Sequence, residues 1–216
     1  LSKDGTVALD WYYPSRDGKL LAYGLSKDGS EVSTLSVRNV DSGQDLPVKI
    51  ERTRACSLAW LPDNSGFYYT RYPAVGDVPK GKENYYRHVY LHILGRDPKN
   101  DPKIFGEGRD PEDWPSVTLS PNGRWLGVNV HQGWAKSEIF VANISAARSN
   151  PGDGRFHPIA QKIPALFDVT LRNDRFYIHT NHEAPRYRLF ELDPKLPPEQ
   201  WADRAKWKEI VPQGDD

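Results

Sequence analysis

The sequence predicts an all-β fold, a segment of a β-propeller with about four blades that are each a four-stranded antiparallel sheet. Composition is the first reason. The 216 residues contain 7 Trp, 11 Tyr and 7 Phe, no Met, 17 Gly and 18 Pro, so large flat side chains alternate with frequent turn formers. The second reason is a repeat. A pair of apolar runs joined by a polar turn occurs four times, at intervals of roughly 50 residues, and propeller blades repeat at about 40 to 50 residues.

We expect each of the four similar segments to form the first hairpin of a blade. They are "YYPSRDGKLLAYGLS" (12–26), "LAWLPDNSGFYYTRY" (58–72), "VTLSPNGRWLGVNVH" (117–131) and "VTLRNDRFYIHTNH" (169–182). The pairs Asp17-Gly18, Asp28-Gly29 and Asn122-Gly123 favour turns with positive φ over ion-binding loops. The chain therefore divides into repeats of approximately 7–50, 51–110, 111–163 and 164–213, all part of one propeller domain.

The remainder of each repeat supplies further strands. Third strands are expected in "EVSTLSVRNVDSGQDLP" (31–47), "YYRHVYLHILGRDPKNDPKIFG" (85–106), "SEIFVANI" (137–144) and "RYRLFELD" (186–193). The signals for fourth strands are weaker, in "KIFG", "FHPIA" and "KWKEIV". The segment 197–210 is alternatively a short helical turn. The loops 73–84 and 148–157 are rich in Gly, Pro and Asp and are expected at the surface.

Charge and cysteine content exclude several classes of protein. Lys plus Arg and Asp plus Glu are both 29, so there is no basic excess of the kind that nucleic-acid and membrane-surface binders carry. The single cysteine, Cys56, allows neither an intrachain disulfide nor a CxxC metal site. No apolar run approaches the roughly 20 residues that cross a bilayer, and no signal peptide opens the chain. We expect a cytoplasmic protein, while a periplasmic one without disulfides would have the same composition. Because Met is missing even at position 1, we also expect a processed chain or a piece of a longer protein.

Four stretches carry a more specific signal than the hairpins alone. They are "LSKDGTVALDWYYPSRDGKLLAYGLSKDGSE" (1–31), "ERTRACSLAW" (51–60), "LSPNGRW" (119–125) and "TNHEAPRYRL" (180–189). In this order and spacing they resemble the propeller segments of the prolyl oligopeptidases, the serine-type prolyl endopeptidases, and the resemblance covers essentially the whole chain.

The resemblance implies an enzyme in two parts. In this family an α/β-hydrolase domain with a Ser, Asp and His triad is joined to a seven-bladed propeller that covers the active site and admits only short peptides. The present chain is similar to part of that propeller. The implied role is to control access of peptide substrates, cleaved after proline, to the hydrolase domain of the same parent chain. No cofactor is implied.

The catalytic elements of the family are missing from this sequence. A nucleophile elbow requires GxSxG at a strand-to-helix turn. The nearest segment, "GLSKD" around Ser26, lacks the second glycine and lies in an expected hairpin. The chain alone is therefore not expected to be an enzyme, although its parent is. The alternative is a non-catalytic propeller that binds a protein or a ligand.

Four residues are candidate substrate contacts by alignment with the family. Ala55 stands where many members have an aromatic side chain, Pro115 follows Trp114 at a position that faces the substrate pocket, and Trp134 follows Gly133 with His131 nearby. Trp134 is the strongest candidate, because a rigid aromatic surface binds an apolar residue at little entropic cost. Packing between blades is the competing interpretation for Trp134, and structural roles are favoured for the other three residues.

Other polar and aromatic residues have simpler explanations. His88 and His92 would lie on one face of a strand but too far apart to share an ion, and His179 and His182 have only Glu183 nearby, so no metal site is expected. Trp11, Trp60 and Trp125 are expected in the core. Cys56 is either a reactive thiol near the pocket or, as for most free cysteines, buried and inert.

Overall fold

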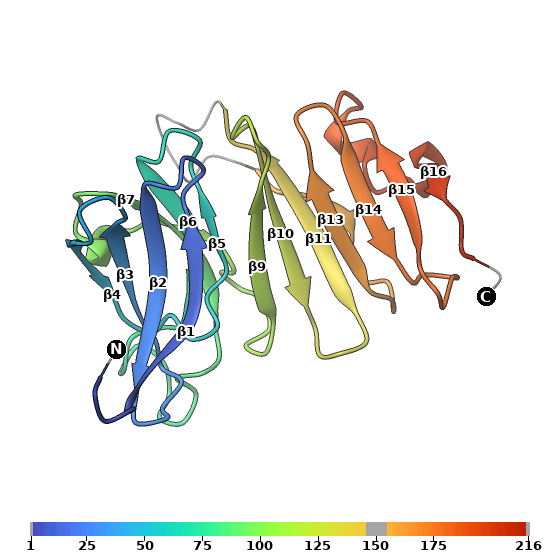
Figure 1. Ribbon diagram of the computed structural model, residues 1–216. Helices are drawn as coiled ribbons and strands as arrows, with labels where there is room; N and C mark the ends of the chain where they lie inside the picture. Colours follow the sequence, from blue (N-terminus) through green and yellow to red (C-terminus); the bar gives the residue numbers. More distant parts are fainter. Residues whose placement is uncertain (1, 146–154, 215–216) are drawn as a thin grey trace. The chain divides into compact units, whose positions relative to one another are not determined.

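The chain forms sixteen strands within residues 2–145 and 155–214, which are the residues that the computed structural model describes (Figure 1). The expected surface loop 148–157 lies partly outside the described residues. Contacts divide the chain into two compact units, Leu1–Pro111 and Glu112–Asp216. Each unit contains two four-stranded antiparallel sheets in which the strands follow chain order.

The first unit holds the first two sheets. The strands of the first sheet are β1 (Val7–Pro14), β2 (Leu20–Lys27), β3 (Thr34–Asn39) and β4 (Asp45–Ile50). Those of the second are β5 (Leu58–Trp60), β6 (Gly66–Arg71), β7 (His88–Ile93) and β8 (Lys103–Phe105), with the 3-10 turn η1 (Pro98–Asn100) between β7 and β8.

The second unit holds the other two sheets. The strands of the third sheet are β9 (Trp114–Leu119), β10 (Trp125–His131), β11 (Ser137–Asn143) and β12 (His157–Ala160). Those of the fourth are β13 (Phe167–Leu171), β14 (Phe176–Thr180), β15 (Arg188–Leu192) and β16 (Lys208–Val211), with two 3-10 turns, η3 (Pro198–Gln200) and η4 (Arg204–Lys206), before β16. The all-β fold class and its four antiparallel four-stranded sheets are therefore confirmed. That all four sheets belong to one propeller domain remains a prediction.

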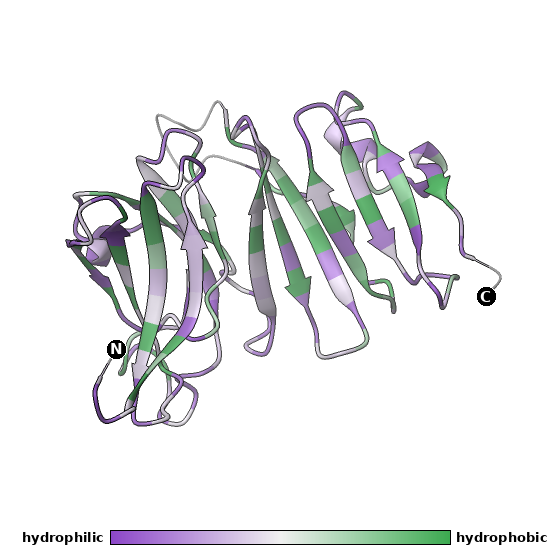
Figure 2. Cartoon of the chain, viewed as in Figure 1, coloured by the Kyte–Doolittle hydropathy of each residue, from purple (hydrophilic) through white to green (hydrophobic). Residues whose placement is uncertain are grey.

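The strands arise from alternation of side chains at a period of two. In β14, Phe176, Ile178 and Thr180 are buried while His179 between them is exposed. Figure 2 shows the same alternation of hydrophobic and hydrophilic residues along β10 and β14. The weak fourth strands are present as β8, β12 and β16. The segment 197–210 contains both features considered for it, because two 3-10 turns precede strand β16.

The first hairpins of the first and third sheets share one turn device. Ser15 Oγ donates to Asp17 Oδ1 at 2.7 Å and accepts from the Leu20 amide at 2.9 Å, and Gly18 has φ 72°. Ser120 does the same with Asn122 at 2.8 Å and the Trp125 amide at 2.9 Å. A side chain that forms hydrogen bonds within its own turn stabilises that turn, so the formation of these hairpins depends on a few neighbouring residues.

The core of the first unit joins its two sheets. Trp60 and Phe67 pack edge to face at 5.1 Å between ring centroids, and Trp60 Nε1 donates to the carbonyl of Tyr13 at 3.0 Å. Trp11 packs partly buried against the same cluster and donates to the carbonyl of Thr53 at 3.0 Å. Cys56 lies in this core, so the buried and inert interpretation of its thiol is the one that the structure supports.

The core of the second unit is more aromatic. Trp125, Phe176 and Trp201 meet in edge-to-face contacts with centroid distances of 5.3, 5.6 and 5.4 Å. Gly127 allows the third and fourth sheets to approach closely, because a Cβ atom there would lie 2.8 Å from Thr118 Cγ2 and 3.0 Å from Leu171 Cδ1. Trp201, for which no strand pattern predicts a core position, is 1% exposed and lies at the end of the turn η3.

Candidate functional site

The tip of the β10–β11 hairpin presents Trp134 to solvent. The hairpin closes through a hydrogen bond from the Gln132 amide to the Lys136 carbonyl at 3.0 Å, and Gly133 takes φ 70°. Gln132 Nε2 also donates to Asp113 Oδ1 at 2.9 Å, which ties the tip to the segment before β9. The Trp134 side chain is 98% exposed. Within the described residues this indole is not packed against a sheet, and its role as a substrate contact stays a prediction.

His131 and Pro115 lie at the same end of the third sheet but on different faces. His131 is exposed and pairs with Trp114 across β9 and β10, whereas Pro115 pairs with Val130 and is buried. Directly opposite residues in an antiparallel pair share a face. Trp114, 43% exposed, therefore accompanies His131. The alignment points to Pro115, but the period of two places Pro115 and Trp114 on opposite faces, and Trp114 is the one that shares the exposed face with His131.

Ala55 occupies the loop of the first unit that leads into β5. It is exposed and has φ 44°, and its carbonyl accepts from Nη2 of Arg87 at 2.7 Å. The same nitrogen donates to Thr70 Oγ1 at 2.6 Å. Burial lowers the pKa of the Arg87 guanidinium below its usual range. The loop of Ala55 is thus fixed by a hydrogen bond from the buried Arg87. The role of Ala55 as a substrate contact stays a prediction.

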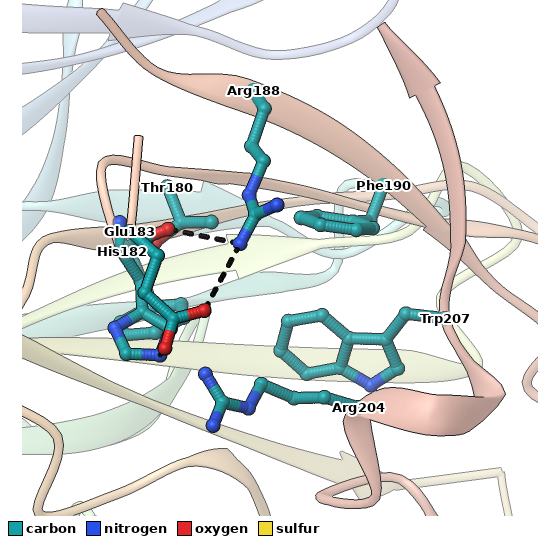
Figure 3. A pocket seen from close by; sticks show the side chains of 8 residues that line it. Thr180, His182, Glu183, Arg188, Phe190, Arg204 and Trp207 are labelled. Carbon is teal, nitrogen blue, oxygen red and sulfur yellow. Dashed lines mark hydrogen bonds and ion pairs between the residues drawn. The ribbon is translucent and has the colours of Figure 1, made fainter. Parts of the chain in front are cut away.

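A cavity of about 340 Å³ lies in the fourth sheet and was not foreseen from the sequence (Figure 3). Its apolar lining consists of Phe167 on β13, Phe190 on β15 and Trp207 just before β16. Trp207 contacts Phe190 edge to face at 5.6 Å and Phe167 at 6.4 Å between centroids. The apolar wall of the cavity is therefore formed by side chains on the core face of the fourth sheet. This size falls at the lower end of the range of small-molecule pockets.

Polar side chains form the rest of the lining. They are Thr180, His182, Glu183, Arg188 and Arg204. Thr180 pairs with Phe167 on one side and Arg188 on the other, so one face of three strands brings an apolar ring, a hydroxyl and a guanidinium together. We name this site the Arg204 cavity, after the cation at its edge.

Arg188 is held in place by several contacts. Its Nη2 donates to the His182 carbonyl at 3.1 Å and lies 3.6 Å from Glu183 Oε2, while Nη1 lies 3.7 Å from Glu209 Oε1. Its guanidinium carbon is 5.0 Å from the centroid of the Phe190 ring. Figure 3 shows the guanidinium pointing toward the Glu183 side of the cavity. The charge of Arg188 is therefore already balanced by two carboxylates.

His182 and Arg204 make fewer hydrogen bonds and ion pairs than Arg188. Nε2 of His182 is buried without a hydrogen bond and lies 3.6 Å from Glu183 Oε1. Burial lowers the pKa of the His182 imidazole, and the charge of Arg204 acts in the same direction, so the ring is neutral at pH 7. The Arg204 guanidinium has neither a hydrogen bond nor an ion pair to any of the described side chains. The cavity thus combines an aromatic wall with one cation that lacks a partner.

A signal for the Arg204 cavity was present in the sequence. Arg188 and Phe190 are two residues apart in a strand and therefore share its face, and an arginine on a face that is otherwise apolar needs a partner or a ligand. The stretch 180–189 contributed only to the family resemblance. Arg204 and Trp207 approach this face through the turn η4, which strand periodicity does not reveal.

Two further observations concern metals and membranes. In residues 2–145 and 155–214, no three side chains of His, Cys, Asp or Glu gather as a metal ion would require. Of the two histidines on β7, His92 bonds to Asp101 instead. A search of the described part of the chain for helices of a length and hydropathy suited to crossing a membrane found none.

Four successive antiparallel meanders of four strands, each starting with a similar hairpin, define a protein of the β-propeller class. The family model described as prolyl oligopeptidase, N-terminal beta-propeller domain, matches residues 1–216, and the chain belongs to that family. The resemblance seen in the sequence is thereby confirmed.

Individual relatives agree with this assignment. The chain is 30% identical over 213 residues to prolyl oligopeptidase A of Galerina marginata, covering 89% of this chain and 29% of the relative. It is 33% identical over 212 residues to prolyl oligopeptidase ophP of Omphalotus olearius, covering 92% of this chain and 28% of the relative. The chain thus spans less than a third of the length of these relatives.

Solved structures share the fold. A structure from a study of two prolyl endopeptidases and their inter-domain dynamics superposes with a TM-score of 0.87 at 33% identity, covering 99% of this chain and 30% of that one. Prolyl oligopeptidase B from Galerina marginata, bound to a 35mer substrate, superposes with a TM-score of 0.86, covering 100% of this chain and 31% of that one. At 21% identity the second likeness shows the fold alone.

Proposed function

We propose that this chain is the propeller portion of a serine peptidase that cleaves short peptides after proline, and that it controls access of peptides to a hydrolase domain of the same parent protein. The observation that carries the proposal is the family match over residues 1–216 together with four sheets of the propeller type. The four sheets are then consecutive blades of one propeller domain.

Trp134 is the proposed point of contact with substrate. Its indole is exposed at the tip of a hairpin that two hydrogen bonds of Gln132 hold in place. Trp114 and His131 lie at the same end of the third sheet and widen this surface. Pro115 and Ala55 remain candidates from the alignment alone. A rigid aromatic group suits the apolar side chains of a peptide, because little entropy is lost when it binds.

The proposal is tested with the full-length protein. A chromogenic peptide with proline before the reporter group should be hydrolysed, and the matched peptide with alanine in place of proline should be hydrolysed much more slowly. A serine-directed fluorophosphonate should abolish the activity. If the full-length protein hydrolyses neither peptide and carries no GxSxG segment, the alternative of a non-catalytic binding propeller replaces this proposal.

A further inference from the structure

The side chains that line the Arg204 cavity include two cations and one anion. Arg188 and Arg204 are cationic and Glu183 is anionic, while the low pKa of His182 keeps its ring neutral at pH 7. Glu209 lies outside the lining, 3.7 Å from Arg188, and brings the local count to two arginines and two carboxylates. Both carboxylates contact Arg188, so Arg204 is the lining cation that has no ion pair among the described side chains. A monoanion matches this charge, whereas a dianion such as phosphate would meet one unpaired cation together with the repulsion of Glu183.

The apolar lining lies close to this cation. Phe190 and Trp207 form an edge-to-face pair, and Trp207 is only three residues beyond Arg204 along the chain. Figure 3 shows the two aromatic rings on one side of the cavity, and the Arg204 side chain extending below Trp207 toward His182 and Glu183. A ligand that reaches Arg204 with its charged end would thus lie against aromatic rings along its body.

Two buried nitrogen atoms lack partners at the same place. Nε of Arg188 and Nε2 of His182 are shielded from solvent but have no hydrogen bond. A buried polar group without a partner is destabilising, so such groups commonly mark the place of a ligand or water. Both belong to residues that line the cavity, and a bound molecule with polar atoms would lower this cost.

The volume limits the size of the ligand. A volume of about 340 Å³ lies at the small end of the range of about 300 to 1,000 Å³ for small-molecule pockets. That space suits one ring or branched aliphatic group with a short polar extension. It is too small for a folded segment or a nucleotide chain.

From these observations we propose that the Arg204 cavity binds a small carboxylate with a flat apolar body. Its carboxylate pairs with the Arg204 guanidinium and its body lies against Trp207 and Phe190. A peptide carboxy terminus and a free aromatic acid share this chemistry. The site is separate from the Trp134 hairpin, and the proposal does not depend on the peptidase activity proposed above.

The experiment is isothermal titration calorimetry on the full-length protein with N-acetylphenylalanine, its neutral amide and phenylacetate. We expect the acid to bind about tenfold more tightly than its amide, because only the carboxylate forms an ionic hydrogen bond with Arg204; a tenfold difference corresponds to about 1.4 kcal/mol. Arg204→Gln should remove this difference. Lys206→Gln is the matched control, because it removes the same charge from the same exposed turn at a residue that does not line the cavity.

The outcomes separate the two sources of ligand. Binding of both N-acetylphenylalanine and the tripeptide Ala-Ala-Phe, lost in Arg204→Gln, indicates a peptide terminus. Binding of phenylacetate without the tripeptide indicates a free acid, and both results support the proposal. Equal affinities for the acid and its amide, no detectable binding of any probe, or equal losses in Arg204→Gln and Lys206→Gln would overturn it. Because Arg204 is exposed, its replacement should not disturb folding.

Discussion

Nδ1 of His92 lies 3.0 Å from Oδ1 of Asp101, and both side chains are shielded from water within the first unit. Tyr69 completes the arrangement, because its hydroxyl donates to Oδ2 of the same carboxylate at 2.8 Å. Burial raises the pKa of the Tyr69 phenol. One carboxylate therefore fastens the segment after η1 to strands β6 and β7.

Replacing Asp101 by Asn should destabilise the protein by about 2 to 3 kcal/mol. The substitution removes the charge. An Asn side chain has one acceptor oxygen and one NH₂ group, so it cannot accept a hydrogen bond at both positions where the Asp101 carboxylate contacts Tyr69 and His92. The measurement is the urea midpoint, followed by tryptophan fluorescence. Asp77→Asn, in an exposed loop of the same unit, is the control and should leave the midpoint unchanged. Equal midpoints for both variants would show that the buried carboxylate is not a structural requirement.

Gly66 cannot carry a side chain in this fold. A Cβ atom at this position would lie 2.1 Å from the carbonyl oxygen of His92, which is backbone and cannot rotate away. Gly66→Ala should therefore force β6 and β7 apart and cost at least about 2 kcal/mol, as overpacking does elsewhere. The comparison is Gly214→Ala, where no atom lies within 4 Å. Similar thermal midpoints for the two variants would contradict the close approach.

Cys56 should be unreactive in the folded protein. The thiol is 3% exposed, and burial raises its pKa to about 11. At pH 8 very little thiolate is present, and thiol reagents attack the thiolate. Ellman's reagent should label the thiol in guanidinium but not in native buffer. Rapid labelling of the native protein at pH 8 would argue against the buried position.

The same thiol makes stability depend on pH in the alkaline range. The folded pKa is higher than the ordinary value near 8.5, so folding favours the protonated form. The resulting stabilisation is fully present below about pH 8.5 and is lost as the pH rises toward 11. The free energy of unfolding of a Cys56→Ala variant should therefore decline less between pH 8.5 and 10.5 than that of the unmodified chain. Parallel curves would exclude this contribution.

Trp134→Ala should separate binding from packing. Since the side chain is 98% exposed, its removal should change the free energy of unfolding by no more than about 0.5 kcal/mol. Trp125→Ala, in the core, should cost about 3 to 5 kcal/mol. In the full-length enzyme, Trp134→Ala should raise KM for longer peptides while folding is unaffected. Unchanged kinetics together with lost stability would support a packing role instead.

The sequence predicted most of the fold because its signals are local. Alternation along a strand and a turn such as Ser120 to Gly123 each depend on a few adjacent residues, so the hairpins and their order could be inferred. The core positions of Trp60 and Trp125 followed from the same strands. Trp201 was missed, because it reaches the core from a turn, where no periodicity applies.

The candidate sites were predicted less completely. Trp134 was named from a family alignment, and the structure shows that it is exposed at a hairpin tip. Its neighbour in space, Trp114, was passed over because cross-strand pairing with His131 depends on the register of β9 and β10. Arg87 and Asp101 likewise gained their roles from contacts between distant segments.

By itself, the sequence determined the class of this protein: four repeats of four strands that belong to the propeller domain of the prolyl oligopeptidase family. Turns and alternation depend on adjacent residues, and their recurrence along the chain reveals the repeats, so all three can be recognised from the sequence. Only the tertiary structure decided where chemistry is possible. Phe167, Arg188 and Arg204 are far apart in the chain, and they line one cavity because three strands and a turn converge there.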